Sequence, residues 1–174
     1  RQAHQLGAFG DNVHALKVDG SFDDCQRMVK SLLGDRHLAT RFALTSANSI
    51  SLGRLLPQMA YYAYAALKLR RESGIGNGES AELPTLIIPT GNLGNALAAI
   101  LVREMGLPLG DIHFATNANR TLPDFFGGGE YRGRPSVATL ANAMDVGDPS
   151  NFERLAWFFR ERNLRQSGIH AHSI

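Results

Sequence analysis

The sequence has little cysteine, no long apolar run and no cluster of basic residues. Among its 174 residues Cys25 is the one cysteine, which rules out a disulfide within the chain and fits a small core residue in a helical pattern. No apolar stretch approaches the roughly 20 residues that cross a bilayer, and no signal-peptide pattern opens the chain. The net charge is +2 without a lysine/arginine block. We therefore expect a cytoplasmic protein that binds neither membranes nor nucleic acid.

The composition is typical of a globular domain. Hydrophobic residues make up 44% and charged residues 20% of the chain. This length is sufficient for one domain with a hydrophobic core, so we expect residues 1–174 to form a single α/β piece. The chain starts at Arg1 rather than at methionine. We therefore also expect it to be a part of a longer protein, with exposed sheet edges that favour self-association.

Strand and helix signals alternate along the chain. Alternating or buried apolar runs predict strands at 13–18, 41–44, 86–88 and 112–116. Helical spacing predicts helices at 22–34, 96–104 and 152–163, and a long helix that opens in the polar segment 45–51 and runs to about residue 71. Pro57 should kink this long helix or displace its first turn. Its expected buried stripe comprises Leu52, Leu55, Leu56, Met59, Ala63, Ala66 and Leu67, and its three tyrosines predict that it is well covered.

This alternation favours an α/β fold with a mostly parallel sheet and helices on both faces, a three-layer sandwich. Ligands of such sheets bind at the carboxyl ends of the strands. Four polar junctions are candidates for these ends, at 46–49, 90–95, 117–121 and 145–151. The segment 74–82 is expected to be a surface loop, and 137–144 gives no clear signal.

The junction at 90–95 is the most informative segment. It reads Thr90, Gly91, Asn92, Leu93, Gly94 and Asn95, between an apolar strand and a helix. Free N–H groups at a helix start, together with the helix dipole, make a site for an anion such as a phosphate monoester. The loop lacks the dinucleotide fingerprint and the P-loop lysine. By its spacing alone it can be either a phosphate site or an ordinary structural turn.

Four segments resemble one enzyme family in the same order along the chain. They are TSANSISLGRLLPQ at 45–58, TGNLGN at 90–95, ATNANRTLPDF at 115–125, and ATLANAMDV with PSNFER at 138–146 and 149–154. Together they are similar to threonine synthase, a pyridoxal-phosphate enzyme of the tryptophan-synthase-β fold type. The resemblance implies that the chain is part of the large domain of such an enzyme, which converts the small molecule O-phosphohomoserine to threonine and phosphate.

The resemblance also implies roles for individual residues. The loop from Thr90 to Asn95 would hold the phosphate of pyridoxal phosphate. Five polar residues are candidates for the substrate side: Asn48, Ser49, Arg54, Ser150 and Asn151. Each has a plainer interpretation, because Asn48 and Ser49 can cap a helix, Ser150 and Asn151 can cap the last helix, and Arg54 can be a surface residue.

The chain departs from the family pattern in one important respect. The lysine that forms a Schiff base with the cofactor belongs to a segment that would lie upstream of Arg1. Lys17, Lys30 and Lys68 have no such context and are expected to be solvated. We therefore expect no catalytic residue in this chain and no activity of the chain alone. The alternative function is a non-catalytic phosphate- or nucleotide-binding α/β module.

Smaller departures occur at Ser51, Leu93 and Arg120, where the family commonly has asparagine, phenylalanine and aspartate. Near the end of the sequence, His170 and His172 lie one residue apart. A metal site needs further ligands with a defined geometry, and the sequence shows none. We therefore expect no metal site there, but a frayed terminus.

Overall fold

The structure is a computed structural model that describes residues 10–49, 51–73, 82–160 and 163–174. The expected loop at 74–82 lies almost entirely outside these residues. The chain divides into two compact units, Arg1–Phe42 and Ala43–Ile174.

The first unit contains two helices, α2 (Phe22–Gly34) and α3 (Arg36–Arg41). Ser21 caps α2 by accepting a hydrogen bond from the backbone N–H of Asp24 at 3.3 Å, and the Asp24 carboxylate accepts one from the Ser21 N–H at 2.7 Å. This reciprocal capping box fixes the start of the helix that the sequence predicts. Asp35 caps α3 by accepting from the N–H groups of two residues in its first turn.

The two strands predicted in this part of the chain are wrong. Residues 13–18 form no strand. In the segment 41–44, Arg41 is the last residue of α3 and residues 42–44 are not in a strand. A strand needs a partner strand for its backbone groups, and the described residues of this unit contain no strand at all. The alternation at 13–18 therefore reflects composition rather than pairing.

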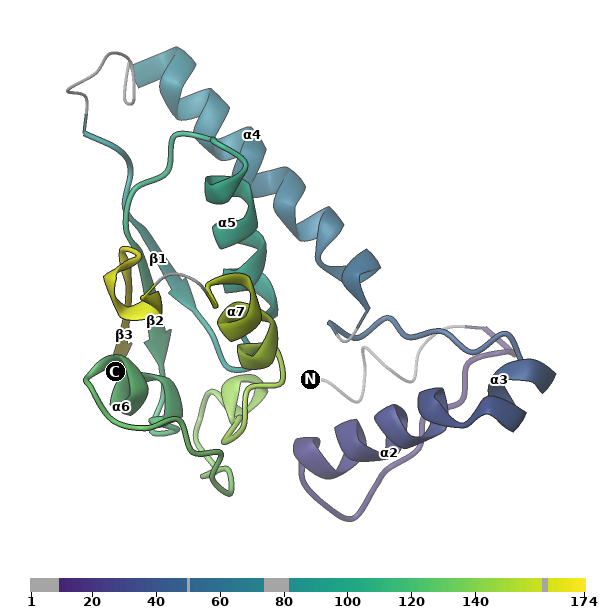
Figure 1. The fold of residues 1–174 in the computed structure, drawn as a ribbon. Helices are drawn as coiled ribbons and strands as arrows, with labels where there is room; N and C mark the ends of the chain where they lie inside the picture. Colours follow the sequence, from purple (N-terminus) through teal and green to yellow (C-terminus); the bar gives the residue numbers. More distant parts are fainter. Residues whose placement is uncertain (1–9, 50, 74–81, 161–162) are drawn as a thin grey trace. The chain divides into compact units, whose positions relative to one another are not determined.

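A three-stranded parallel sheet organises the second unit. Its strands are β1 (Leu86–Pro89), β2 (Ile112–Thr116) and β3 (Ile169–Ser173), in the order β1-β2-β3 (Figure 1). Ile88 lies opposite Phe114 across the first pair, and Phe114 lies opposite Ala171 across the second. The predicted α/β class with a parallel sheet is confirmed. The frayed terminus predicted around His170 and His172 is wrong, because both residues belong to β3.

The helices of this unit are α4 (Leu56–Ser73), α5 (Gly94–Glu104), α6 (Thr121–Phe126) and α7 (Phe152–Phe158), with short 3-10 turns η1 (Leu52–Arg54), η2 (Asn142–Met144) and η3 (Leu164–Gln166). In Figure 1, α5 and α7 lie on one side of the sheet, and α4 runs along α5. The helix predicted at 96–104 begins two residues earlier, and the one predicted at 152–163 ends at Phe158.

The core lies between one face of the sheet and helices α5, α6 and α7. Its buried members include Ile88, Leu97, Ile100, Ile112, Phe114, Leu122, Phe152, Leu155, Phe159 and Ile169. Phe114 in the central strand is completely buried, and its ring meets Phe126 of α6 edge to face. The opposite face of the sheet is more open, since Ile87 is 74% exposed there.

Helix α4 starts later than the sequence predicts. It begins at Leu56 and places Pro57 in its first turn, where proline needs no N–H partner. The displaced start is therefore confirmed. The predicted buried stripe is only partly correct, because Leu55 and Ala66 are buried while Leu52, Leu56 and Leu67 are exposed.

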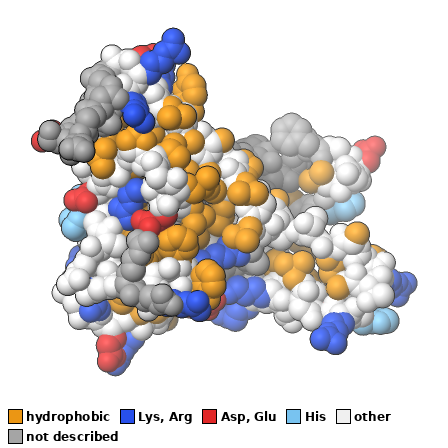
Figure 2. Space-filling model, turned by 45° about the horizontal axis from the view of Figure 1, so that its top comes forward, with side chains coloured by type: hydrophobic (Ala, Val, Ile, Leu, Met, Phe, Trp, Pro, Cys, Tyr) orange, Lys and Arg blue, Asp and Glu red, His pale blue; other side chains and the backbone are white. Residues whose placement is uncertain are grey.

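The prediction that α4 is well covered is wrong in this structure, since Tyr61 and Tyr64 are also exposed. Hydrophobic side chains accordingly gather on the surface of the second unit (Figure 2). Among the described residues, no helix combines the length and the apolar character that crossing a membrane requires.

Truncating a side chain on the buried face of the sheet should lower the free energy of unfolding more than truncating one on the open face. Phe114→Ala should lower the free energy of unfolding by about 3–5 kcal/mol, because it removes a buried ring and leaves a cavity. Ile87→Ala, on the open face, should change it by less than about 0.5 kcal/mol. Urea unfolding followed by circular dichroism would measure both. Equal losses in the two variants would contradict the placement of the core.

Candidate functional site

The loop at 90–95 connects the end of β1 with the start of α5. Thr90 extends the sheet by donating its N–H to the carbonyl of Ala115 at 3.0 Å, and its side chain is buried. Leu93 precedes α5 with φ 62 and ψ 0, a left-handed conformation that non-glycine residues seldom adopt. Its side chain is 1% exposed and belongs to the core. The burial of Leu93 therefore holds the turn in this conformation.

Both glycines of the loop lie where a side chain would collide with neighbouring segments. A Cβ atom on Gly91 would lie 2.9 Å from the carbonyl oxygen of Met144 and 3.0 Å from a methyl group of Val146. A Cβ atom on Gly94 would lie 3.0 Å from Cβ of Ser49. The loop is thus packed from two sides, by the segments around residues 49 and 145.

The N–H groups of the loop are suited to an anion. Leu97 donates its N–H to the carbonyl of Leu93, as the first helical turn requires. For the N–H groups of residues 91–95, the described part of the chain provides no backbone or side-chain acceptor. The eleven-residue helix α5 adds the positive end of its dipole at this point. The N–H groups and the dipole together place partial positive charge at this turn.

Asn151 ties this loop to a distant part of the chain. Its amide is almost completely buried, at 1% exposure. The Nδ2 group donates to the carbonyl of Asn92 at 2.8 Å and to Oγ of Ser49 at 2.9 Å, and Oδ1 accepts from Arg154 at 2.8 Å. Arg154 also donates to the carbonyl of Ser49. One side chain therefore joins three segments of the candidate site.

Ser150 holds the side chain of the same loop asparagine. Its N–H and its hydroxyl both donate to Oδ1 of Asn92, at 2.6 and 3.0 Å. Nδ2 of Asn92 lies 3.4 Å from Oγ of Ser49, at the long end of hydrogen bonding. The capping interpretation holds for Asn151 by position only, because Asn151 is the N-cap residue of α7 and its carbonyl accepts from the N–H of Leu155, but its side chain makes no cap hydrogen bond.

The remaining predicted residues lie further from this network. Asn48 donates its N–H to Oγ of Ser46, and its Oδ1 lies 3.4 Å from Oγ of Ser49. The capping interpretation of Asn48 and Ser49 does not hold, since Ser51 precedes η1 and α4 begins only at Leu56. Arg54 is exposed in η1. The structure thus brings Ser49, Ser150 and Asn151 onto the loop, places Asn48 beside them, and leaves Arg54 at the surface.

Asn95 fixes the loop to helix α4. Its Oδ1 accepts from the hydroxyl of Tyr62 at 2.5 Å, and its Nδ2 donates to Oε1 of Gln58 at 3.3 Å. Burial, reinforced by the neighbouring Tyr61, raises the pKa of the Tyr62 phenol far above its usual value. Tyr62 therefore remains protonated and keeps donating at any physiological pH.

A second polar network borders the loop where Met144 and Val146 lie against Gly91. Asp145 accepts from the N–H and the hydroxyl of Thr139, at 2.9 and 2.7 Å, and from Nδ2 of Asn117 at 2.7 Å. The Thr139 hydroxyl, more than the other donors, lowers the pKa of the Asp145 carboxyl. Asp145 lies between Met144 and Val146, which contact Gly91. The polar junctions at 117–121 and 145–151 were the available sequence signal.

The charged residues singled out in the sequence lie on the surface. Lys17, Lys30 and Lys68 are all exposed, as expected of solvated lysines. Arg120, which departs from the family pattern, pairs with Asp124 four residues later at 3.3 Å. Asp124 also pairs with Arg134 at 2.7 Å, so Arg120 belongs to an exposed ion-pair cluster at the start of α6.

The chain is similar to threonine synthases over most of its length. It is 39% identical over 153 residues to threonine synthase from Serratia marcescens, covering 88% of this chain and 34% of that protein. The crystal structure of threonine synthase from Escherichia coli superposes with a TM-score of 0.80 at 36% identity, covering 95% of this chain and 37% of that one.

A pyridoxal-phosphate-bound threonine synthase from Brucella melitensis superposes with a TM-score of 0.73 at 31% identity, covering 99% of this chain and 41% of that one. The chain spans about a third of the length of the curated relatives that it matches. No family model matches it. These relatives confirm the resemblance and the fold type that the four segments predict.

The buried amide of Asn151 should contribute more to the free energy of unfolding than the amide of an exposed asparagine. Asn151→Ala should lower the free energy of unfolding by about 1–3 kcal/mol, because it removes the buried hydrogen bonds of this amide to the Asn92 carbonyl, to Ser49 and to Arg154. Asn142→Ala, at an exposed position in η2, should change it by less than about 0.5 kcal/mol. Chemical denaturation would measure both. A neutral Asn151→Ala would show that this amide does not hold the loop.

The network around Asp145 predicts a pH dependence. Since folding lowers the pKa of Asp145, the native state gains stability from the carboxylate above the unfolded value of about 3.9. This contribution disappears as the pH falls through the folded pKa. The stability difference between the native chain and Asp145→Asn should therefore be largest near neutral pH and shrink below about pH 4. Denaturant titrations at pH 7, 4 and 3 would test this, and a constant difference would contradict it.

Proposed function

We propose that this chain, which is homologous to about a third of threonine synthase, holds the phosphate of pyridoxal phosphate in its loop at 90–95. The proposed activity of the protein is the conversion of O-phosphohomoserine to threonine and phosphate. We also propose a cytoplasmic location and a small-molecule substrate, as the sequence predicts.

The observation that carries the proposal is the glycine loop at the start of α5. Its N–H groups have no acceptor in the described part of the chain, and a Cβ atom on either glycine would collide with its neighbours. Backbone donors of this kind suit a phosphate dianion because they supply partial positive charge without a lysine. The residues present therefore fit the phosphate group of the cofactor.

Pyridoxal phosphate, when bound, serves as an electron sink for amino-acid carbanions. The part we assign to this chain is binding and orientation. The amides of Gly91 to Asn95 would donate to the phosphate, and the hydroxyl of Thr90 would add a further donor. Ser150 and Asn151 would act as positioning residues, since they hold the side chain and the carbonyl of Asn92.

The other candidates are proposed for the substrate side. Ser49 lies against Gly94 and bonds to Asn151, so it would shape the wall of the site. Asn48 contacts Ser49 and would support it. Arg54 is exposed and would be the cation for the substrate phosphate, because a guanidinium binds phosphate through several donors.

The alternative is a phosphate- or nucleotide-binding module without catalysis. Both functions use the same loop for a phosphate group. They differ in whether a protein that contains this chain forms threonine.

Substituting Gly94 should weaken cofactor binding selectively. The chain should bind pyridoxal phosphate at least about tenfold more tightly than pyridoxal, which lacks the phosphate. This factor corresponds to a difference of about 1.4 kcal/mol in binding free energy. Gly94→Val should abolish most of this difference, because its side chain would push Ser49 away from the loop. Fluorescence titration with both ligands would measure the effect.

Gly53→Val is the matched control, since the nearest atom to a Cβ at Gly53 lies at an ordinary 3.5 Å. It should bind pyridoxal phosphate as the native chain does. Circular dichroism would establish that both variants fold. Equal binding of pyridoxal and pyridoxal phosphate by the native chain would refute the phosphate loop.

The purified 174-residue chain should not form threonine from O-phosphohomoserine, even when saturated with pyridoxal phosphate. The reason is that none of its lysines lies in the context that the family uses to bond the cofactor. Amino-acid analysis of the reaction mixture would test this. Threonine formed at a rate above the cofactor-only control would overturn the assignment of the chain as a binding part.

A further inference from the structure

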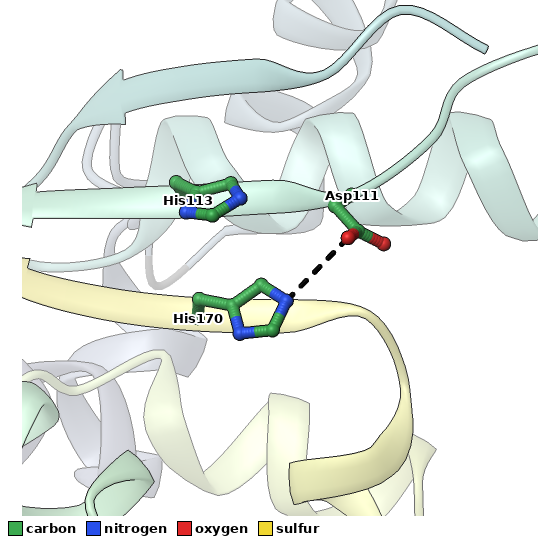
Figure 3. Close-up of side chains that lie close together, drawn as sticks. All are labelled: Asp111, His113 and His170. Carbon is green, nitrogen blue, oxygen red and sulfur yellow. Dashed lines mark ion pairs between the residues drawn. The ribbon is translucent and has the colours of Figure 1, made fainter. Parts of the chain in front are cut away.

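A second cluster of polar side chains lies at the opposite end of the sheet from the loop. Asp111 directly precedes β2, His113 is the second residue of β2, and His170 is the second residue of β3 (Figure 3). The strands are parallel and pair His113 with His170, so both imidazoles project from the same face. The loop follows the carboxyl end of β1, whereas this cluster lies at the amino ends of β2 and β3.

The distances within the cluster are short. Nε2 of His170 lies 3.6 Å from Oδ2 of Asp111. The rings of His113 and His170 stack with centroids 4.6 Å apart and an interplanar angle of 27°. One ligand atom from each of the three residues lies within 4.8 Å of the other two. The three side chains thus lie close together at the surface.

A third histidine, His172, contacts the ring of His113 and fixes its orientation. Nε2 of His172 lies 2.9 Å from Nδ1 of His113, and the two rings are nearly parallel. This contact engages one nitrogen of His113 and leaves the other for a ligand. Metal-binding histidines commonly have such a partner on their second nitrogen, which fixes the orientation of the ring.

We propose that Asp111, His113 and His170 bind one divalent transition-metal ion of the zinc type. Two imidazole nitrogens and one carboxylate oxygen are a ligand set that such ions accept, with water in the open position. Two donors bound to one ion at about 2.1 Å lie at most about 4.2 Å apart. The three ligand atoms lie within 4.8 Å of one another, so the side chains rotate when they bind one ion.

The surroundings permit these rotations. The side chains of Asp111 and His170 are 57% and 45% exposed, so both can move and an ion can reach them. The backbone atoms beneath them are fixed by strand pairing, which keeps the ligands together. The site is separate from the loop at 90–95 and does not depend on the function proposed for it.

Calorimetric titration of the untagged 174-residue chain with Zn²⁺ tests the proposal. We expect one ion per chain, and visible absorption bands when Co²⁺ replaces Zn²⁺. His170→Gln and Asp111→Asn should each weaken Zn²⁺ binding by at least about tenfold, the smallest loss seen when groups around a bound metal are removed. His37→Gln, an exposed histidine of the first unit, should bind Zn²⁺ as the native chain does.

Three results would overturn the proposal. They are no Zn²⁺ binding by the native chain, unchanged affinity in both ligand variants, or Mg²⁺ binding as tight as that of Zn²⁺, since Mg²⁺ prefers all-oxygen sites. Both ligand variants alter exposed side chains, and circular dichroism would verify that they fold. Binding of pyridoxal phosphate should be the same with and without Zn²⁺, so failure of either proposal is recognised independently.

Discussion

The candidate site depends on one buried amide. Asn151 bonds to the carbonyl of Asn92 and to Ser49, which lie 59 and 102 positions away in the sequence. Burying an amide without partners is costly, so the three segments are stable together only when all its hydrogen bonds are made. The same requirement fixes Arg154, which bonds both to Asn151 and to the Ser49 carbonyl. The loop therefore obtains its position from residues outside it.

The shape of the loop, by contrast, comes from the core. Leu93 adopts a left-handed conformation that costs energy for a leucine, yet its side chain is among the most buried of the described residues. Burial of that side chain and the start of α5 immediately after it offset the strain. Gly91 and Gly94 then permit close approach on either side. A loop fixed in this way is preformed, so binding a phosphate need not order it first.

The sequence predicts those elements whose signals are local. The helix 22–34 and the strand 112–116 occur as predicted, because a capping serine and a buried apolar run are sufficient to define them. The strand at 13–18 fails because alternation says nothing about a pairing partner. β3 was missed for the converse reason: Ile169 and Ala171 alternate with two histidines, and only pairing with β2 reveals a strand. The loop was predictable as a motif, whereas the role of Asn151 depends on contacts that no local pattern contains.

The two ends of the sheet show how parallel pairing makes sites of different kinds. At the carboxyl end, the donors of the candidate loop are backbone N–H groups, so most side-chain changes there would act through packing, as at Gly94. At the amino end, strand register places His113 beside His170, and the chemistry lies entirely in side chains. The loop requires small residues at its glycine positions but tolerates many different side chains around it. The second site is lost when one ligand changes, so its persistence depends on Asp111, His113 and His170 individually.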